Sequence, residues 1–271
     1  MSANLAKAGF EVRGYDISAK QRAALKRAGG IPVASIARLK APILITSLPT
    51  AAALHSISEG LAGTNRIVIE TSTLPIEDKE KARDTLKRKG ITLLDCPLSG
   101  TGAQAKLKDL VVFASGDRSG FERAKPVFAG FSRSHYYVGA FGNGSRMKFV
   151  ANLLVAIHNV AAAEALVLGR KSGLPAKMIF DVIENSAGTS RMFQVRGPQM
   201  VRRRYDGPGI ALELFQKDMK IIGEFAARIG APTSLFNASA AIYNAAMAQG
   251  HAKDDTAAVC AVLESMAGLR R

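Results

Sequence analysis

Residues 66–100 read RIVIETSTLPIEDKEKARDTLKRKGITLLDCPLSG, and this stretch decides the fold. Residues 66–70 and 91–95 are short apolar runs, each suited to a strand that is buried on both faces. Between them, residues 77–89 have the charged, amphipathic spacing of a helix that ends at Gly90. A strand, a helix and a second strand in this order predict a parallel βαβ unit.

The same alternation of strand and helix continues on both sides of this unit. Further strands are predicted at residues 10–15, 42–47, 110–115 and 135–138, and further helices at residues 18–28 and 51–60. The pattern then changes to helices alone, which are predicted at residues 147–172, 175–185, 212–229, 232–249 and 255–267. We therefore expect an α/β domain at residues 1–139, followed by an all-α domain at residues 140–271.

A nucleotide site is predicted at the start of the α/β domain. A Rossmann-like fold places a Gly-rich turn after its first strand and an acidic residue about 20 residues later. The G-x-G-x-x-A match at residues 100–105 is rejected, because about seven residues before the next strand cannot form a crossover helix. Asp16 instead follows an apolar strand, where its carboxylate can bind ribose hydroxyls. We therefore expect a Rossmann-like domain whose first strand and Gly-rich turn are missing.

The composition is that of a globular protein and narrows the range of partners. Apolar residues make up 48% of the 271 residues, enough to bury a core. Lys and Arg number 37 against 22 Asp and Glu, so the formal charge is +15. A basic surface attracts anions, but aromatic residues are only 6% of the chain, and proteins that bind single-stranded nucleic acid combine both. We expect a solvated basic surface, densest at Arg202, Arg203 and Arg204 beside Arg196, and no nucleic-acid partner.

The sequence also argues against a membrane-spanning protein and against a metal-binding protein. No uninterrupted apolar run approaches the roughly 20 residues that a membrane-spanning helix needs. Cys96 and Cys260 lie far apart without a C-x-x-C motif, which argues against a cysteine zinc site and fits a reducing cytoplasm. The four histidines lack the spacing of metal ligands, so no metal site is predicted.

Six short motifs follow one another along the chain. They are residues 1–5 with Gly9, Leu48-Pro49, Ser72-Thr73 with Pro75, the D-x-P-x-S-G of residues 95–100, Gly142-x-Gly144-x-x-x-Lys148-x-x-x-Asn152, and Lys217-Asp218. Together they resemble the β-hydroxyacid dehydrogenase family, which includes 3-hydroxyisobutyrate dehydrogenase and tartronate semialdehyde reductase. The chain departs from the family pattern at Thr101 and Ala151, where many members have Gly and Asn.

The resemblance implies a reaction and the residues that perform it. The reaction is the NAD(P)-dependent oxidation of a small β-hydroxyacid to the semialdehyde, or the reverse reduction. Lys148 would act as general acid or base, because the helix dipole and loss of water both favour a neutral amine in the first turn of a helix. Asn152 lies four residues later, on the same helix face, and would hold the reacting hydroxyl.

The remaining predicted site residues contact the substrate carboxylate or the cofactor. Donors at Ser99, Gly100 and Thr101 would bind the carboxylate. The cofactor would contact Asp16, Leu48, Pro49, Thr73 and Lys217. A carboxylate at Asp16 pairs with ribose hydroxyls and repels a 2′-phosphate, so NAD is favoured over NADP. The apolar helices exceed what so small a domain can bury, and the family implies a homodimer or homotetramer.

A function of a second class remains open. A non-catalytic, dehydrogenase-like scaffold, or an inactive truncated copy, would use the basic surface to bind an anionic partner. The charge and the absent Gly-rich turn favour the scaffold, whereas the pair Lys148 and Asn152 with Ser99-Gly100 favours the enzyme. The enzyme is the leading hypothesis, and its particular hydroxyacid is not predicted.

Overall fold

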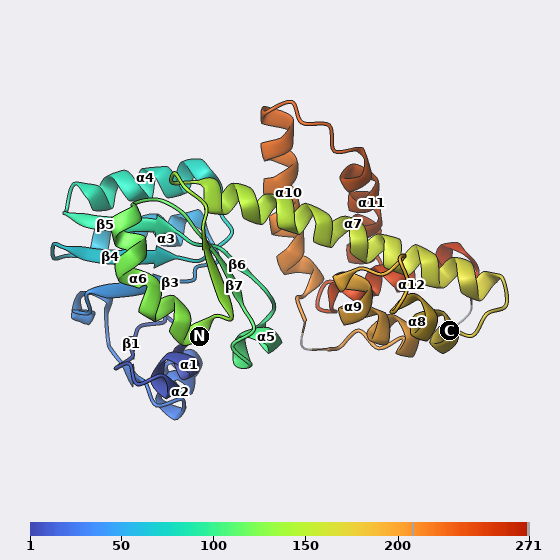
Figure 1. Cartoon of the computed structure of the whole chain (residues 1–271), viewed down its shortest axis with the longest axis horizontal. Helices are drawn as coiled ribbons and strands as arrows, with labels where there is room; N and C mark the ends of the chain where they lie inside the picture. The colour runs from blue at the N-terminus through green and yellow to red at the C-terminus, as the bar shows by residue number, and fades with distance from the viewer. Residues whose placement is uncertain (208, 270–271) are drawn as a thin grey trace. The chain divides into compact units, whose positions relative to one another are not determined.

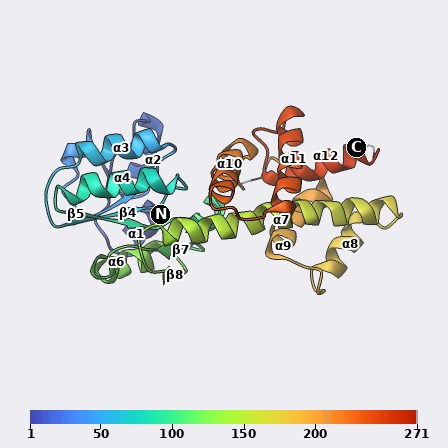
Figure 2. The same ribbon diagram turned by 90° about the horizontal axis from the view of Figure 1, so that it is seen from above.

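The protein consists of two compact units, Met1–Lys148 and Phe149–Arg271, which are called the first and second units below. The computed structural model describes residues 1–207 and 209–269 (Figures 1 and 2). The first unit contains strands and helices, and the second contains helices, so the predicted fold class is confirmed. The units divide within one long helix, α7, and the domain boundary predicted at residue 139 stays a prediction.

The centre of the first unit is a parallel sheet covered on both faces. Its strand order is β3-β4-β5, formed by Ile43–Thr46, Arg66–Glu70 and Ile91–Asp95. Ile67 and Ile69 point into one apolar core and Val68 into the other, because side chains alternate along a strand. Helices α3 (Ala51–Gly60) and α4 (Ile76–Lys87) cover the Val68 face, and α6 (Arg118–Phe131) covers the opposite face (Figure 2).

A second sheet continues from the end of β5. It is formed by β6 (Leu98–Ser99), β7 (Val111–Ala114) and β8 (Ser134–Tyr137). The strands β6 and β7 are antiparallel, and only the short helix α5 (Gly102–Lys106) lies between them. A hairpin needs no crossover helix, which agrees with the rejection of residues 100–105 as a dinucleotide fingerprint. An antiparallel bridge between Asp95 and Ser115 connects the two sheets.

The amino-terminal segment forms a third, separate pair of strands. Helix α1 (Ser2–Lys7) is followed by β1 (Arg13–Gly14), α2 (Ala19–Arg27) and β2 (Ile31–Pro32), with a 3-10 turn at Ile36–Arg38. The strand predicted at residues 10–15 is therefore shorter than expected. The two strands pair in parallel, and within the described residues no pairing connects them to β3. Within the described residues, the strands thus form three sheets and not one continuous parallel sheet.

The second unit consists of helices around the carboxyl-terminal part of α7 (Asn143–Lys171). They are α8 (Ala176–Ile183), α9 (Arg191–Arg202), α10 (Leu212–Arg228), α11 (Ser234–Ala248), a 3-10 turn at Thr256–Ala258, and α12 (Val259–Met266). The sequence pattern did not predict α9, because Gly197 and Pro198 lie inside it and are typical of loops.

The basic cluster predicted around α9 is only partly solvated. Arg196 is buried and contacts the Asp255 carboxylate at 3.1 Å, and Arg203 contacts Glu264 at 3.0 Å. Arg202 and Arg204 are exposed. The expectation of one solvated arginine surface is therefore wrong for Arg196, which is buried against Asp255, and Arg203 is half-buried against Glu264.

Among the described residues, helix α7 has a length and composition that would allow it to cross a membrane, since its 29 residues include an 18-residue window of mean hydropathy 1.7. Asn152, His158 and Asn159 lie within this helix, so it contains no uninterrupted apolar run of about 20 residues. The same window is 44% buried inside the protein, and a core helix of a globular domain meets the same criterion.

Candidate functional site

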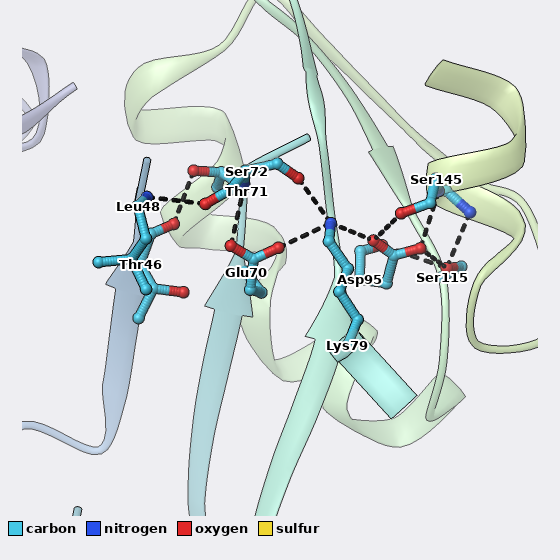
Figure 3. A network of polar contacts seen from close by, with 10 residues as sticks. Thr46, Leu48, Glu70, Thr71, Ser72, Lys79, Asp95, Ser115 and Ser145 are labelled. Atoms are coloured by element: carbon cyan, nitrogen blue, oxygen red, sulfur yellow. Dashed lines mark hydrogen bonds and ion pairs between the residues drawn. The ribbon is translucent and has the colours of Figure 1, made fainter. Parts of the chain in front are cut away.

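The carboxyl ends of the three parallel strands carry the polar residues of the first unit. Thr46, Glu70 and Asp95 end β3, β4 and β5, and the sheet register pairs Thr46 with Glu70 and Glu70 with Asp95. Figure 3 shows the side chains of Glu70 and Asp95 in a network of polar contacts at this edge, where Thr46 contributes its backbone carbonyl oxygen. Ligands of open α/β sheets bind at this edge, so the network lies where a cofactor or substrate is expected.

A buried lysine is the centre of this network. Lys79 is on α4, and its Nζ lies 2.6 Å from the carbonyl oxygen of Ser72, 2.8 Å from Asp95 Oδ1 and 2.7 Å from Glu70 Oε2 (Figure 3). The contacts with Ser72 and Asp95 are hydrogen bonds and the contact with Glu70 is an ion pair, so the ammonium group is surrounded by three oxygen atoms. Burial alone lowers the pKa of Lys79, but the carboxylates of Asp95 and Glu70 outweigh it and hold that pKa above its ordinary value.

The loops after β3 and β4 are joined to each other. The Leu48 amide donates to Ser72 Oγ at 2.7 Å, and the Ser72 amide donates to Glu70 Oε1 at 2.9 Å. Thr73 follows directly and is half-buried, whereas Pro49 is exposed. The three residues predicted to contact the cofactor in this region, Leu48, Pro49 and Thr73, therefore lie on two loops that one serine connects.

Asp95 also holds the first turn of α7. Its Oδ2 accepts the Ser145 amide at 2.8 Å and its Oδ1 accepts the Ser145 hydroxyl at 2.8 Å. Ser115 Oγ accepts the Gly144 amide at 2.9 Å. A Cβ at Gly144 would lie 2.6 Å from the Asp95 carbonyl oxygen, so only glycine allows this close approach. A carboxylate at a helix N-terminus also offsets the positive end of the helix dipole.

The predicted catalytic pair lies on α7. Lys148 is 9% exposed and Asn152 is 5% exposed, and they are one turn apart on the helix. Within the second unit, the Asn152 side-chain amide donates to Asp218 Oδ2 at 2.9 Å. The Lys217 ammonium lies 3.6 Å from Asp218 Oδ1, and its side chain is 41% exposed. The structure therefore brings Asn152 and Lys217 together through Asp218.

Asp16 lies two residues after β1 and is exposed. Its Oδ1 accepts the Ser18 amide at 2.8 Å, at the start of α2. This is the strand-end turn that an aspartate commonly forms. The second carboxylate oxygen is not needed for that turn, so a ribose contact and the turn are compatible.

In the segment predicted to bind the substrate carboxylate, residues 99–101, the polar groups of Thr101 bond to a residue close by in the sequence. Ser99 ends β6, and Gly100 has φ +129°, which favours glycine. Thr101 is the N-cap of α5: its amide donates to Gln104 Oε1 at 2.9 Å, and its hydroxyl accepts the Gln104 amide at 3.4 Å. The polar groups of Thr101 are thus used in a capping box.

Three polar residues of the network were not predicted from the sequence. Lys79 lies on the buried face of α4, at the same spacing as Ile76, Ala82 and Leu86, and a cation on an apolar stripe was the available signal. Glu70 lies at the end of an apolar strand next to the strand that Asp95 ends, which indicates a carboxylate pair at the sheet edge. Ser145 carried no separate signal.

The parallel sheet, its polar carboxyl edge and the helical second unit define the class of NAD(P)-binding oxidoreductases. A family profile for the NAD-binding domain of 6-phosphogluconate dehydrogenase matches residues 1–139. A second profile, described as the NAD-binding domain of NADP-dependent 3-hydroxyisobutyrate dehydrogenase, matches residues 142–263. The chain belongs to the β-hydroxyacid dehydrogenase family, as its motifs indicated.

Known relatives are similar to this protein over nearly the whole chain. An L-threonate dehydrogenase from Cupriavidus necator is 31% identical over 265 residues, which cover 94% of this chain and 89% of that protein. The crystal structure of 3-hydroxyisobutyrate dehydrogenase from Salmonella typhimurium is 26% identical, with a TM-score of 0.87 over 96% of this chain and 94% of that one. The Mycobacterium tuberculosis 3-hydroxyisobutyrate dehydrogenase, in a structure with L-serine, is 30% identical, with a TM-score of 0.86 over 97% and 94%.

Proposed function

We propose that this protein oxidises a small β-hydroxyacid with NAD, or reduces the corresponding semialdehyde, and that Lys148 is its general acid–base group. The observation that carries the proposal is that Lys148 and Asn152 are both buried and one turn apart on α7. A lysine and an amide side chain that lie on the same helix face, one turn apart, can act together on one substrate hydroxyl. The related L-threonate and 3-hydroxyisobutyrate dehydrogenases support the substrate class.

The proposed chemistry gives each residue one role. In oxidation, the neutral amine of Lys148 takes the proton of the substrate hydroxyl, and in reduction the ammonium returns it. Asn152 donates one amide hydrogen to Asp218, which leaves its second hydrogen and its carbonyl oxygen for the reacting hydroxyl. The substrate carboxylate binds at Ser99 and Gly100, with Thr101 shaping the turn through its cap on α5.

The residues at the carboxyl ends of the strands fit a nicotinamide dinucleotide. Asp16 is exposed and keeps one carboxylate oxygen for a ribose, and Leu48, Pro49 and Thr73 lie on the two connected loops. When bound, the nicotinamide supplies the hydride acceptor. Lys217, at 41% side-chain exposure, supplies a positive charge for a cofactor phosphate or the substrate. We favour NAD over NADP because the Asp16 carboxylate repels a 2′-phosphate.

The decisive experiment combines calorimetry and an activity assay on this 271-residue chain. NADH is titrated into the protein, and 3-hydroxyisobutyrate, L-threonate, glycerate and L-serine are each assayed with NAD and NADP. Binding of NADH and turnover of at least one acid support the proposal. Absence of both contradicts it and favours a non-catalytic scaffold, for which the charge of +15 suggests an anionic partner.

The role of Lys148 has its own test. Lys148→Ala should lower kcat by about 10²–10⁴-fold, because the proton transfer loses its positioned base. The Kd of NADH, measured by the same titration, should stay within about threefold of the parent value, since the predicted cofactor contacts are other residues. Unchanged turnover in the variant would refute the assigned role.

The cofactor preference is tested by Asp16→Asn. The asparagine side-chain oxygen can still accept the Ser18 amide, so the turn is kept while the negative charge is lost. NADH should bind about tenfold more weakly and NADPH more tightly, so that the ratio of their Kd values moves towards NADPH. An unchanged ratio means that Asp16 does not contact the ribose.

A homodimer or homotetramer remains part of the proposal. Leu168, Leu235 and Met266 of the second unit are 73%, 69% and 70% exposed, and large apolar side chains at such exposure favour association. Light scattering with size-exclusion chromatography measures the mass directly. A mass of 28.7 kDa, that of one chain, would contradict the expectation.

A further inference from the structure

One ammonium group connects three segments to which the proposed function gives separate tasks. The Lys79 Nζ contacts the carbonyl of Ser72, next to the cofactor-side residue Thr73. It also contacts Asp95, which begins the segment that leads to Ser99 and Gly100. Asp95 in turn accepts both the amide and the hydroxyl of Ser145, three residues before Lys148. All these contacts lie within the first unit.

Burying this cluster costs more free energy of desolvation than burying apolar side chains in the same place would. The side chains of Lys79 and Glu70 are 0% exposed, and Asp95 is equally buried. Two carboxylates and one ammonium leave a net buried charge of −1, and buried ion pairs seldom stabilise a protein more than apolar residues of the same size. The neighbouring positions Ile76, Ala82 and Leu86 on α4 show that this helix face can be apolar. What the cluster adds is fixed direction, because the contacts of Lys79 with Ser72 and Asp95 are hydrogen bonds of defined geometry, and the Glu70 carboxylate adds an ion pair.

The geometry at the start of α7 is equally constrained. The four Asp95 carboxylate contacts come from Lys79, the amide and hydroxyl of Ser145, and Ser115 at 3.3 Å. With these donors, both carboxylate oxygens are fully used. Gly144 packs so closely that an added Cβ would lie 2.4 Å from the Phe113 carbonyl oxygen. The first turn of α7 therefore has one position relative to the ends of β5 and β7.

We propose that Lys79 is a positioning residue for the reaction. Its ammonium fixes Asp95 relative to the Ser72-Thr73 loop, and Asp95 fixes the first turn of α7 and thereby the direction in which Lys148 leaves the helix. Lys79 acts through these groups and is not itself a catalytic residue, since it is fully buried and its ammonium group already contacts three oxygen atoms of the protein. The inference rests on the proposed role of Lys148.

The test is a double variant that keeps the buried charge. Glu70→Gln with Lys79→Met removes one negative and one positive charge, so the cluster retains its net charge of −1 on Asp95 while the bridge is lost. Arg66→Met is the matched control. Arg66 is a buried cation at the opposite end of the same strand β4, where it donates to the carbonyls of Leu39, Ala41 and Ala62 at 2.7, 2.9 and 2.7 Å. Both variants remove a buried cation and its hydrogen bonds.

The readouts separate positioning from stability. We expect the double variant to lose about 100-fold in kcat with 3-hydroxyisobutyrate or L-threonate, because a displacement of about 1 Å has this effect on catalysis. The Kd of NADH should rise by a smaller factor than kcat falls, because the bonds of Ser72 with Leu48 and with the side chain at residue 70 still hold the cofactor-side loop. The backbone amides of residues 143–148 should exchange hydrogen faster than in the parent. The Arg66→Met control should keep kcat within about threefold and the slow exchange of these amides. Active-site concentration is determined for each variant, so that an unfolded fraction does not count as a lower kcat.

Each other outcome overturns the proposal. A double variant that keeps its kcat shows that Lys79 is not needed to position Lys148, and an equal loss in Arg66→Met shows that kcat follows stability alone. If the double variant does not fold, Ser145→Ala decides, because it keeps all three charges and removes one hydrogen bond to Asp95. It should lower kcat about tenfold at unchanged NADH affinity, and an unchanged kcat contradicts the proposal. If the parent protein itself neither binds NADH nor turns over any acid, the proposed function is wrong. This outcome can be told apart from the variant outcomes because it is seen before any substitution is made.

Discussion

Two ion clusters, one in each unit, bury charge in opposite ways. In the first unit one ammonium, Lys79, lies between two carboxylates, and the side chains of the Lys79–Glu70 and Lys79–Asp95 pairs are 0% exposed. In the second unit one carboxylate, Glu264, contacts two arginines, Arg170 and Arg203. The Glu264 side chain is 3% exposed, but the arginine side chains are 21% and 23% exposed and reach water.

The difference indicates what each cluster is for. Glu264 on α12 contacts Arg170 on α7 and Arg203 at the end of α9, so this cluster joins three helices and keeps its cations hydrated. The cluster of the first unit has no hydrated member and lies at the carboxyl edge of the sheet, beside the start of the helix that carries Lys148. A closed cluster loses more when one member is removed, because water cannot replace the missing partner.

The largest effect is expected for Lys79→Met. The substitution leaves the carboxylates of Glu70 and Asp95 buried and facing each other, and breaking a buried pair in this way costs about 3–5 kcal/mol of the free energy of unfolding. Urea unfolding, followed by far-UV circular dichroism, measures the loss. A loss below about 1 kcal/mol would mean that the first cluster tolerates the removal of one member as well as the second cluster does.

The sequence predicted the fold well wherever the apolar pattern alone determines an element. The strands at residues 66–70 and 91–95 have the bounds predicted, because all five residues of Arg66–Glu70 are buried on a two-faced sheet. Helices α6 and α9 were missed, since Pro126, Gly197 and Pro198 lie inside them and local composition favours loops there. In these helices, tertiary packing of Phe121, Phe128 and Phe193 overrides local preference.

The candidate site was less predictable than the fold. Motif spacing was enough to place Lys148 and Asn152 on one helix face, because both lie on a single element with a known period. It could not show that Asp95 holds the Ser145 amide, since 50 residues separate them and only the folded sheet brings them together. The place of Lys79 in the site was equally hard to predict. A charged side chain on a charged helix is ordinarily exposed, and only the three contacts of its ammonium group explain its burial.

A smaller effect is expected for Glu264→Gln in the second unit. The variant loses its charge and its ion pairs with Arg170 and Arg203, but both guanidinium groups can turn towards water. We expect a loss of about 1–3 kcal/mol in the free energy of unfolding, the range for hydrogen bonds to charged groups. The value of kcat should not change, and the same urea and activity measurements check both statements. A loss as large as that of Lys79→Met, or a fall in kcat, would remove the contrast between the clusters.

The smallest effect is a dependence on alkaline pH that only the first cluster should show. The carboxylates of Asp95 and Glu70 hold the pKa of Lys79 above its ordinary value, in spite of the burial that lowers it. Below about pH 10.4, the ordinary lysine pKa, the folded and unfolded chains both carry this proton, so the contribution of Lys79 to stability is complete. Above that pH the unfolded chain releases the proton while the folded chain keeps it, so stability falls by about 1.4 kcal/mol per pH unit. The second cluster contains no lysine, so no such slope is expected from it.

This slope is isolated by comparing the urea unfolding of the parent with that of the double variant, Glu70→Gln with Lys79→Met, at pH 8, 9.5 and 11. Every other titrating group is common to both proteins, so the difference between their free energies of unfolding reports the removed pair. That difference should be constant from pH 8 to 9.5 and smaller at pH 11. A difference that rises between pH 8 and 9.5 would mean that desolvation outweighs the two carboxylates, because the folded chain would then release the proton before the unfolded chain does. The first cluster would then hold a lysine close to neutrality, and the second cluster, with its hydrated arginines, would be the more firmly charged of the two.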